Sequence, residues 1–239
     1  MKVSRILDAA EELLLAYGYR KVTIDEVAGR AGVGKGTVYL YWTSKRDLFA
    51  AVLARSTARL VAAQFAAVRA DPAEVRLHRS IRRSFLLTMR SPVVKALATG
   101  DHVMLGEVLT RSEAGSHYVL GKVDTTARYL TILYEHGLLA EDPATDPTLF
   151  YRLSAAVLGS YLLEAGPPGT DDIPGAELDL EAKADALVTT LRRAFEPATE
   201  PSEATLRAAA GELADLYRQW LADLAGYLPQ ATSFEVEEV

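Results

Sequence analysis

Apolar side chains recur at helical spacing along nearly the whole chain, and this pattern constrains the fold more than any other feature. Such spacing places apolar groups on one face of an α-helix. No stretch alternates between apolar and polar residues in the way that a half-buried strand would. A clear example of the helical repeat is the run Ile24, Val27, Ala28 and Ala31. We therefore expect an all-α protein.

Glycine, proline and capping residues predict where the helices begin and end. Ser4 and Thr23 are candidate N-caps, and Gly18 is a candidate end of the first helix. We expect helices over about 4–17, 24–31, 35–41, 45–70, 73–90, 92–110 with a break near Gly100, 116–136, 147–164, 178–196 and 202–228. The segment 165–177, rich in proline and glycine, is expected to be a loop. The tail 229–239 is expected to be disordered.

Charge is distributed unevenly along the chain. The formal net charge is −6, which would disfavour nucleic acid if it were uniform. Lysine and arginine nevertheless outnumber aspartate and glutamate by eight to five in residues 1–46, and are outnumbered 18 to 27 in the remainder. A basic end on an acidic body suggests that the N-terminal part meets an anion.

The sequence lacks the residues that several kinds of site require. The chain has no cysteine, which excludes a disulfide framework, a thiolate metal site and a cysteine nucleophile. No histidines stand in a metal-binding spacing, and no G-x-S-x-G nucleophile motif occurs. The sequence shows no signal-peptide run and no apolar stretch of about 18 residues. We expect a cytoplasmic protein that has no metal or cofactor and is not an enzyme.

Two short predicted helices joined by residues 31–34 have the geometry of a helix-turn-helix. The turn, Ala31-Gly32-Val33-Gly34, needs glycine because its backbone conformation resists a Cβ. In the third helix Val38 and Trp42 are one turn apart and can face a small core. The residues left on the exposed face suit phosphates and base edges, and they are Lys35, Thr37, Tyr39 and Tyr41.

The same stretch is also similar to a phosphate-binding loop. Residues 29–35 fit the first part of the pattern G-x-x-x-x-G-K-[ST], but Gly36 stands where serine or threonine is required. The segment before it is helical, whereas the phosphate-binding loop follows a strand. We therefore disfavour nucleotide binding.

The run from Ile6 to Val52 resembles the DNA-binding domain of the tetracycline-repressor-like (TetR) family of bacterial transcriptional regulators. Trp42 stands where the family more often has phenylalanine, and the N-terminal arm of some relatives is nearly absent. The motifs that carry the resemblance, at fixed spacing, are Ile6-Leu7-Asp8-Ala9-Ala10, Gly18-Tyr19, Thr23-Ile24-Asp25-Glu26-Val27-Ala28, Ala31-Gly32-Val33, Gly36-Thr37-Val38-Tyr39 and Trp42-x-Ser44-Lys45-x-x-Leu48.

The resemblance implies a domain of residues 1–46 whose third helix lies in the major groove of double-stranded DNA. It implies a palindromic operator bound by a homodimer, and a repressor released by a small-molecule inducer. Residues 47–228 would form the helical ligand-binding and dimerisation domain. The residues to which the resemblance assigns DNA contacts are Thr23, Lys35, Gly36, Thr37, Tyr39, Leu40, Tyr41 and Lys45.

Beyond about residue 70 no motif matches, so ligand and dimer residues are inferred from the apolar pattern. A cavity is expected among the helices 45–70, 73–90, 92–110 and 116–136. Its expected lining is Phe65, Phe85, Met89, His102, Met104, Tyr118 and Tyr129. Helices 147–164 and 178–196 are expected to pair with their symmetry mates in a four-helix bundle. The expected contacts are Leu149, Leu153, Val157, Tyr161, Leu187, Leu191 and Phe195.

Alternatives to this interpretation remain open. The apolar stripes could pack inside one subunit, with 202–228 forming the dimer contact instead. The chain could be a DNA-binding module controlled without a small ligand, or a helical enzyme that carries a vestigial helix-turn-helix. The enzyme would need convergent titratable groups in a pocket, and the sequence offers no recognisable set.

Overall fold

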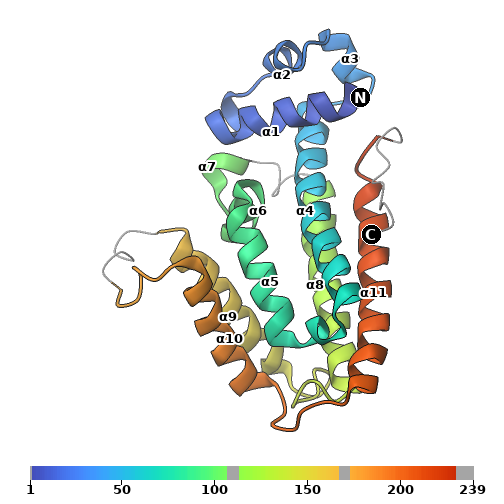
Figure 1. Ribbon diagram of the computed structural model, residues 1–239. Coiled ribbons are helices and arrows are strands. Elements are labelled where there is room, and N and C mark those ends of the chain that lie inside the picture. The colour runs from blue at the N-terminus through green and yellow to red at the C-terminus, as the bar shows by residue number, and fades with distance from the viewer. Residues whose placement is uncertain (1, 107–112, 167–172, 230–239) are drawn as a thin grey trace. The chain divides into compact units, whose positions relative to one another are not determined.

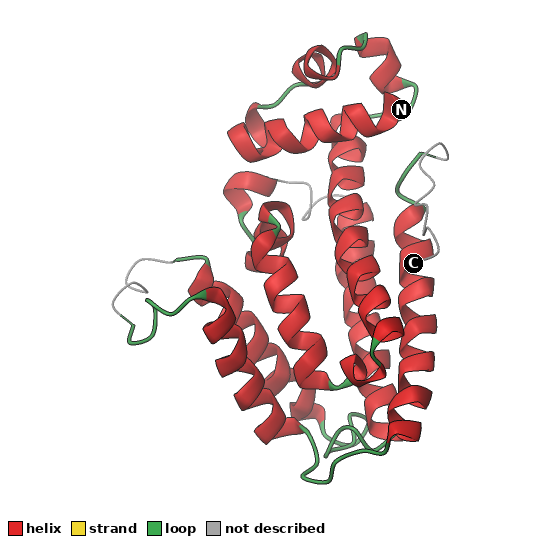
Figure 2. Cartoon of the chain, viewed as in Figure 1, coloured by secondary structure: helices red, strands yellow, loops and turns green. Residues whose placement is uncertain are grey.

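The computed structural model of the protein describes residues 2–106, 113–166 and 173–229. Every regular element in these ranges is a helix, as predicted (Figure 2). The elements, labelled in Figure 1, are α1 (Lys2–Lys21), α2 (Ile24–Ala31), α3 (Lys35–Tyr39), α4 (Lys45–Ala70), the 3-10 helix η1 (Pro72–Val75), α5 (Leu77–Arg90), α6 (Pro92–Thr99), α7 (His102–Leu105), α8 (Glu113–Glu135), α9 (Pro147–Glu164), α10 (Leu180–Phe195) and α11 (Glu203–Ala225). The expected tail lies almost wholly outside the described residues.

The chain divides into two compact units. The first contains residues 1–59, 91–122 and 220–239, and the second contains residues 60–90 and 123–219. The first unit is larger than the expected 1–46 domain because α6 and α7 also pack against α1. Helix α4 contributes its first half to one unit and its second half to the other.

Local capping explains why the short helix α2 forms. The Thr23 side chain accepts a hydrogen bond from the Glu26 N–H at 3.3 Å, and the Glu26 carboxylate accepts one from the Thr23 N–H at 2.7 Å. This reciprocal capping box confirms Thr23 as the N-cap. Gly32, at φ 64°, ends α2 in the left-handed conformation that favours glycine. Ser4 lies inside α1, which already begins at Lys2, so its prediction as an N-cap was wrong.

The buried guanidinium of Arg55 joins α1 to the first half of α4. The side chain of Arg55 is 8% exposed, and its two terminal nitrogens lie 2.7 Å from a carboxylate oxygen of Asp8 and 2.6 Å from one of Glu11. A buried charge is tolerated only when it is paired and hydrogen-bonded. The two carboxylates are one helical turn apart, so the pair fixes which face of α1 meets α4.

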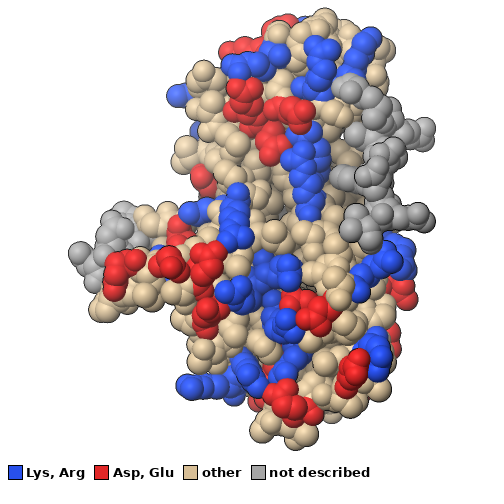
Figure 3. Space-filling view, viewed as in Figure 1, with Lys and Arg blue, Asp and Glu red and all other residues tan. Residues whose placement is uncertain are grey.

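In the second unit, α5, α9 and α10 pack against one another (Figure 1). The rings of Phe85 on α5 and Tyr161 on α9 stack with centroids 5.8 Å apart. Glu196, directly after α10, has a side chain that is 2% exposed and contacts Arg76 at 3.0 Å and His78 at 2.8 Å. Basic and acidic side chains are interspersed over the face shown in Figure 3.

Helix α4 is the one described helix that is long and apolar enough to cross a membrane. Its most apolar stretch is, however, 72% buried inside the protein. Burial of this kind is typical of a core helix, since a helix in contact with lipid would keep its apolar surface exposed.

We predict opposite effects for two glycine-to-alanine substitutions in the first unit. At Gly18 φ is +74°, and a Cβ would lie 2.9 Å from the carbonyl oxygen of Val103. Gly18→Ala should therefore lower the free energy of unfolding by about 1–3 kcal/mol. At Gly29, inside α2, a Cβ would meet nothing within 4 Å. Gly29→Ala should raise the free energy of unfolding by about 0.5–1 kcal/mol. Urea unfolding measures both values, and equal midpoints would contradict this account of Gly18.

Candidate nucleic-acid interface

Helix α3 presents a short exposed surface immediately after the turn that follows α2. Val38 and Trp42 are buried, as predicted, and anchor the helix in the core of the first unit. Tyr39 is 46% exposed and Leu40, the residue after the helix, is 81% exposed. Both side chains are therefore accessible to another molecule.

The beginning of α3 combines a tethered cation with open backbone. The Nζ atom of Lys35 lies 2.7 Å from a carboxylate oxygen of Asp25 on α2. This hydrogen bond raises the pKa of Lys35 above its ordinary value, because it favours the charged form. Gly36 is exposed, and a Cβ there would meet nothing within 4 Å. A ligand can therefore approach the backbone closely at this position.

Two further candidates, Thr23 and Lys45, lie at the N-terminal ends of α2 and α4. Thr23 is exposed, and its hydroxyl donates a hydrogen bond to the Glu26 carboxylate at 2.8 Å. Lys45 is half-buried, with its Nζ atom 4.3 Å from the ring centroid of Tyr19. Burial lowers the pKa of Lys45, and the negative charge of Glu26 opposes that shift.

The remaining candidates are less exposed than the sequence pattern suggests. Thr37 is half-buried on α3. Tyr41 is half-buried against the core of the first unit, and its ring centroid lies 5.7 Å from that of Trp42. The sequence pattern predicts Thr37 and Tyr41 on the exposed face of one helix. Helix α3 ends at Tyr39, so Tyr41 lies beyond it.

The residues predicted to line a ligand cavity are dispersed over both units. Phe65 and Tyr129 are buried in the second unit, where the Tyr129 hydroxyl donates to the Val75 carbonyl at 2.8 Å. Met104 packs against the core of the first unit. Met89 is half-buried on α5. The side chains of His102 and Tyr118 lie outside the described part of the structure.

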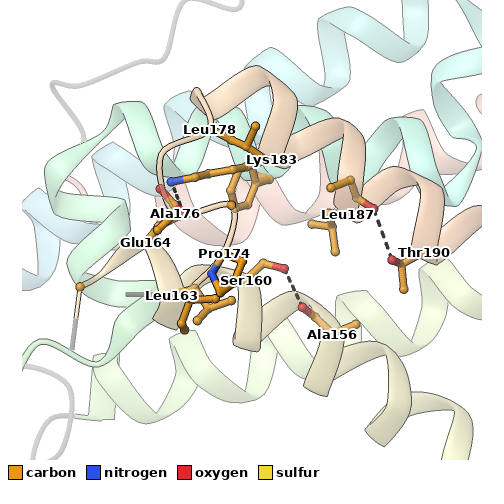
Figure 4. A pocket seen from close by; sticks show the side chains of 15 residues that line it. Ala156, Ser160, Leu163, Glu164, Pro174, Ala176, Leu178, Lys183, Leu187 and Thr190 are labelled. Atoms are coloured by element: carbon orange, nitrogen blue, oxygen red, sulfur yellow. Dashed lines mark hydrogen bonds and ion pairs between the residues drawn. The ribbon is translucent and has the colours of Figure 1, made fainter. Parts of the chain in front are cut away.

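Phe85 is the predicted lining residue that borders a pocket found in the second unit. This pocket has a volume of about 560 Å³ and lies among α5, α9, α10 and the loop 173–178 (Figure 4). Its lining is Phe85, Ala156, Ser160, Leu163, Glu164, Gly166, Ile173, Pro174, Gly175, Ala176, Leu178, Lys183, Ala186, Leu187 and Thr190. Sequence reasoning assigned α9 and α10 to dimerisation alone. The small residues of α9 and the neighbouring proline-rich loop were the signals that could have indicated a pocket.

The structure changes which side chains of α9 and α10 are available to a partner. Val157 is half-buried, and the other predicted dimer residues are buried inside one subunit: Leu149, Leu153, Tyr161, Leu187, Leu191 and Phe195. Their apolar stripes face α5 and each other, which is the alternative that the sequence left open. Helix α9 instead exposes Tyr151 (75%), Leu158 (45%) and Leu162 (49%) on another face.

The family model for bacterial regulatory proteins of the tetR family matches residues 6–52, which contain α2, the turn and α3. Over these residues the chain is similar to the tetR family. The HTH-type transcriptional activator FasR of Mycolicibacterium smegmatis is 40% identical over 65 residues, which are 27% of this chain and 30% of that protein. The chain thus matches less than a third of the length of this curated relative.

Solved structures of transcriptional regulators are similar to most of the chain in fold. A tetR-family transcriptional regulator from Streptomyces coelicolor is 25% identical, with a TM-score of 0.53, over 93% of this chain and 89% of that one. The regulator FadR from Bacillus subtilis, solved in complex with stearoyl-CoA, is 18% identical, with a TM-score of 0.55, over 79% of this chain and 96% of that one. The second likeness is one of fold alone.

We predict that the capping box at Thr23 controls the titration of Glu26. Hydrogen bonds from the Thr23 hydroxyl and N–H hold the pKa of Glu26 below its ordinary value. The stability that this adds is present above the ordinary glutamate pKa and is lost as pH falls through the depressed one. In Thr23→Ala the pKa of Glu26 should rise, whereas Thr23→Ser should leave it in place. NMR titration measures the pKa of Glu26. An identical value in the unmodified protein and both variants would refute the role given to the Thr23 hydroxyl.

Proposed function

We propose that the protein is a cytoplasmic transcriptional regulator that binds operator DNA as a homodimer and releases it in response to a small molecule. The observation that carries the proposal is the exposed surface of α3 within a segment of the tetR family. A capped α2, a left-handed glycine turn and a buried Val38–Trp42 anchor hold this surface outward. The three features together are what a helix needs in order to enter the major groove.

In the proposed complex, the start of α3 and Leu40 lie closest to the bases. Lys35 exchanges its contact with Asp25 for a base edge or a phosphate, since the pair is exposed and worth little in water. Gly36 permits close approach of the backbone, and the methyl groups of Thr37 and Leu40 suit the thymine methyl. These contacts distinguish one sequence from another.

The phosphates are contacted from the flanks of α3. Thr23 stands at the N-terminus of α2, where the helix dipole favours an anion. Lys45 begins α4, and its stacking on Tyr19 restricts the ammonium group to one position beside the duplex. Tyr39 and Tyr41 offer phenol hydroxyls to phosphates or base edges. Such contacts add affinity for any sequence and fix the register of the protein on DNA.

Dimerisation is proposed to use the exposed face of α9. One helix of five residues makes few base contacts, so useful specificity requires two half-sites. Tyr151, Leu158 and Leu162 form an apolar stripe at helical spacing that is left in solvent in a single chain. A second copy that packs on this stripe would bury it around a two-fold axis.

The response to a small molecule is proposed from the size of the helical body and from the fold. The likeness to FadR, solved with stearoyl-CoA, shows that this fold accommodates a ligand in at least one protein. A ligand lowers DNA affinity only when it binds the DNA-free state more tightly than the DNA-bound state. A coupling of about 2.7 kcal/mol would lower operator affinity about 100-fold.

The DNA interface is tested by separating affinity from sequence preference. Lys45→Ala should weaken binding to all sequences alike and reduce the slope of log affinity against log salt by about one, since one phosphate contact is lost. Thr37→Ala should instead change the preferred bases. Binding is measured by fluorescence anisotropy on duplexes selected from a random pool. Arg207→Ala, an exposed cation of the second unit, is the matched control and should have no effect. Altered base preference with an unchanged salt slope in Lys45→Ala would contradict its phosphate role.

The dimer interface is tested by charging the exposed stripe of α9. Leu158→Glu with Leu162→Glu should convert the dimer to a monomer in sedimentation at micromolar concentration, because four buried carboxylates would face one another. The matched control is Val123→Glu with Tyr134→Glu, which charges exposed apolar residues of α8 and should leave the dimer intact. An intact dimer in the α9 variant would move the interface elsewhere, with α11 as the next candidate.

A further inference from the structure

The pocket in the second unit has an apolar wall that is held rigidly in place. Phe85 is 1% exposed, and its ring is fixed by stacking on Tyr161 at an interplanar angle of 4°. Leu187 is 6% exposed and adds to the same wall. Ala156 on α9 and Ala186 on α10 also line the pocket, and their small side chains leave space between the two helices.

Two hydroxyl groups on the pocket wall are oriented as hydrogen-bond acceptors. The Ser160 hydroxyl donates to the carbonyl of Ala156 at 2.8 Å, and the Thr190 hydroxyl donates to the carbonyl of Ala186 at 3.3 Å. Each proton is therefore committed to the hydroxyl's own helix, which leaves the lone pairs of the oxygen directed outward. A ligand that carries an N–H or O–H group would find an acceptor on either helix.

The polar end of the pocket is already electrically neutral. The Nζ atom of Lys183 lies 2.9 Å from a carboxylate oxygen of Glu164, and the two side chains are 22% and 19% exposed. Figure 4 shows this pair at the mouth, beside the loop 173–178. An ionic ligand would find no unpaired charge on this pair and would have to compete with one of its partners for the other. This disfavours a charged ligand relative to a neutral one.

The rim of the pocket exposes apolar surface that an occupant would cover. Leu163, Ile173 and Leu178 are 50%, 41% and 46% exposed. Covering apolar surface contributes about 25 cal/mol per Å². The volume of about 560 Å³ is within the range of small-molecule sites in proteins.

We propose that this pocket binds an uncharged amphipathic molecule. Its apolar body lies against Phe85 and Leu187, and its N–H or O–H group donates to Ser160 or Thr190. The regulatory consequence rests on the proposed function: α9 carries pocket residues such as Ser160 and the exposed stripe with Leu158 and Leu162. An occupant would thus act on the helix that is proposed to pair the two subunits.

The test uses an uncharged fluorescent probe, N-phenyl-1-naphthylamine, titrated into the full chain without DNA. This probe has an apolar body and one N–H donor. We expect saturable binding of one probe per chain. Ala186→Trp, at an exposed lining position, should fill the space and weaken binding at least about tenfold, or about 1.4 kcal/mol. Ala194→Trp, an exposed position of α10 that does not line the pocket, is the matched control and should bind as the unmodified protein does.

The preference for an uncharged ligand is tested with a sulfonated probe of similar shape, 1-anilinonaphthalene-8-sulfonate. It should bind the unmodified protein at least about tenfold more weakly than the uncharged probe. Glu164→Gln frees the Lys183 ammonium, so it should strengthen binding of the sulfonate relative to binding of the uncharged probe.

Three results would overturn the inference: no saturable binding, equal affinity in Ala186→Trp, or equal affinity for both probes in the unmodified protein. DNA binding is measured separately, so the two claims fail separately. Binding of the probe without binding of DNA would support the pocket and refute the proposed function. Binding of DNA without binding of the probe would refute the pocket and support the DNA-binding part of the proposed function.

Discussion

The burial of the Arg55 guanidinium between Asp8 and Glu11 is the interaction on which the arrangement of the first unit depends. Loss of either carboxylate would leave a buried cation incompletely paired, so α1 has one acceptable orientation on α4. Helix α1 in turn packs against α2, and α2 against α3. The direction in which α3 presents Tyr39 and Leu40 therefore depends on how this salt bridge orients α1.

Elements whose cause is local could be predicted from the sequence. The capping box at Thr23, the left-handed turn at Gly32 and the bounds of α9 each depend on residues a few positions apart. The inner and outer faces of α9 could not be distinguished, because both carry leucines: Leu149 and Leu153 are buried, while Leu158 and Leu162 are exposed. Which stripe faces inward is decided by packing on α5 and α10, and the periodicity does not contain that information.

The candidate sites show the same division. The exposed surface of α3 could be predicted because motif, turn and core anchor lie within twenty residues of one another. The pocket could not, because its walls come from α5, α9, α10 and a loop, and its key ion pair joins residues 164 and 183. The sequence indicates Phe85 as a lining residue only through its aromatic ring. The assembly of Ser160, Thr190 and the neutral pair around that ring is a property of tertiary structure.

The α3 surface is proposed to read DNA as part of a symmetric dimer. Hydroxyl-radical footprinting of the protein on a duplex selected from a random pool tests this proposal. We expect two protected patches related by two-fold symmetry, with centres separated by one helical turn, about 10 base pairs, or a multiple of it. Enrichment of no sequence, or a single protected patch without a symmetric counterpart, would contradict it.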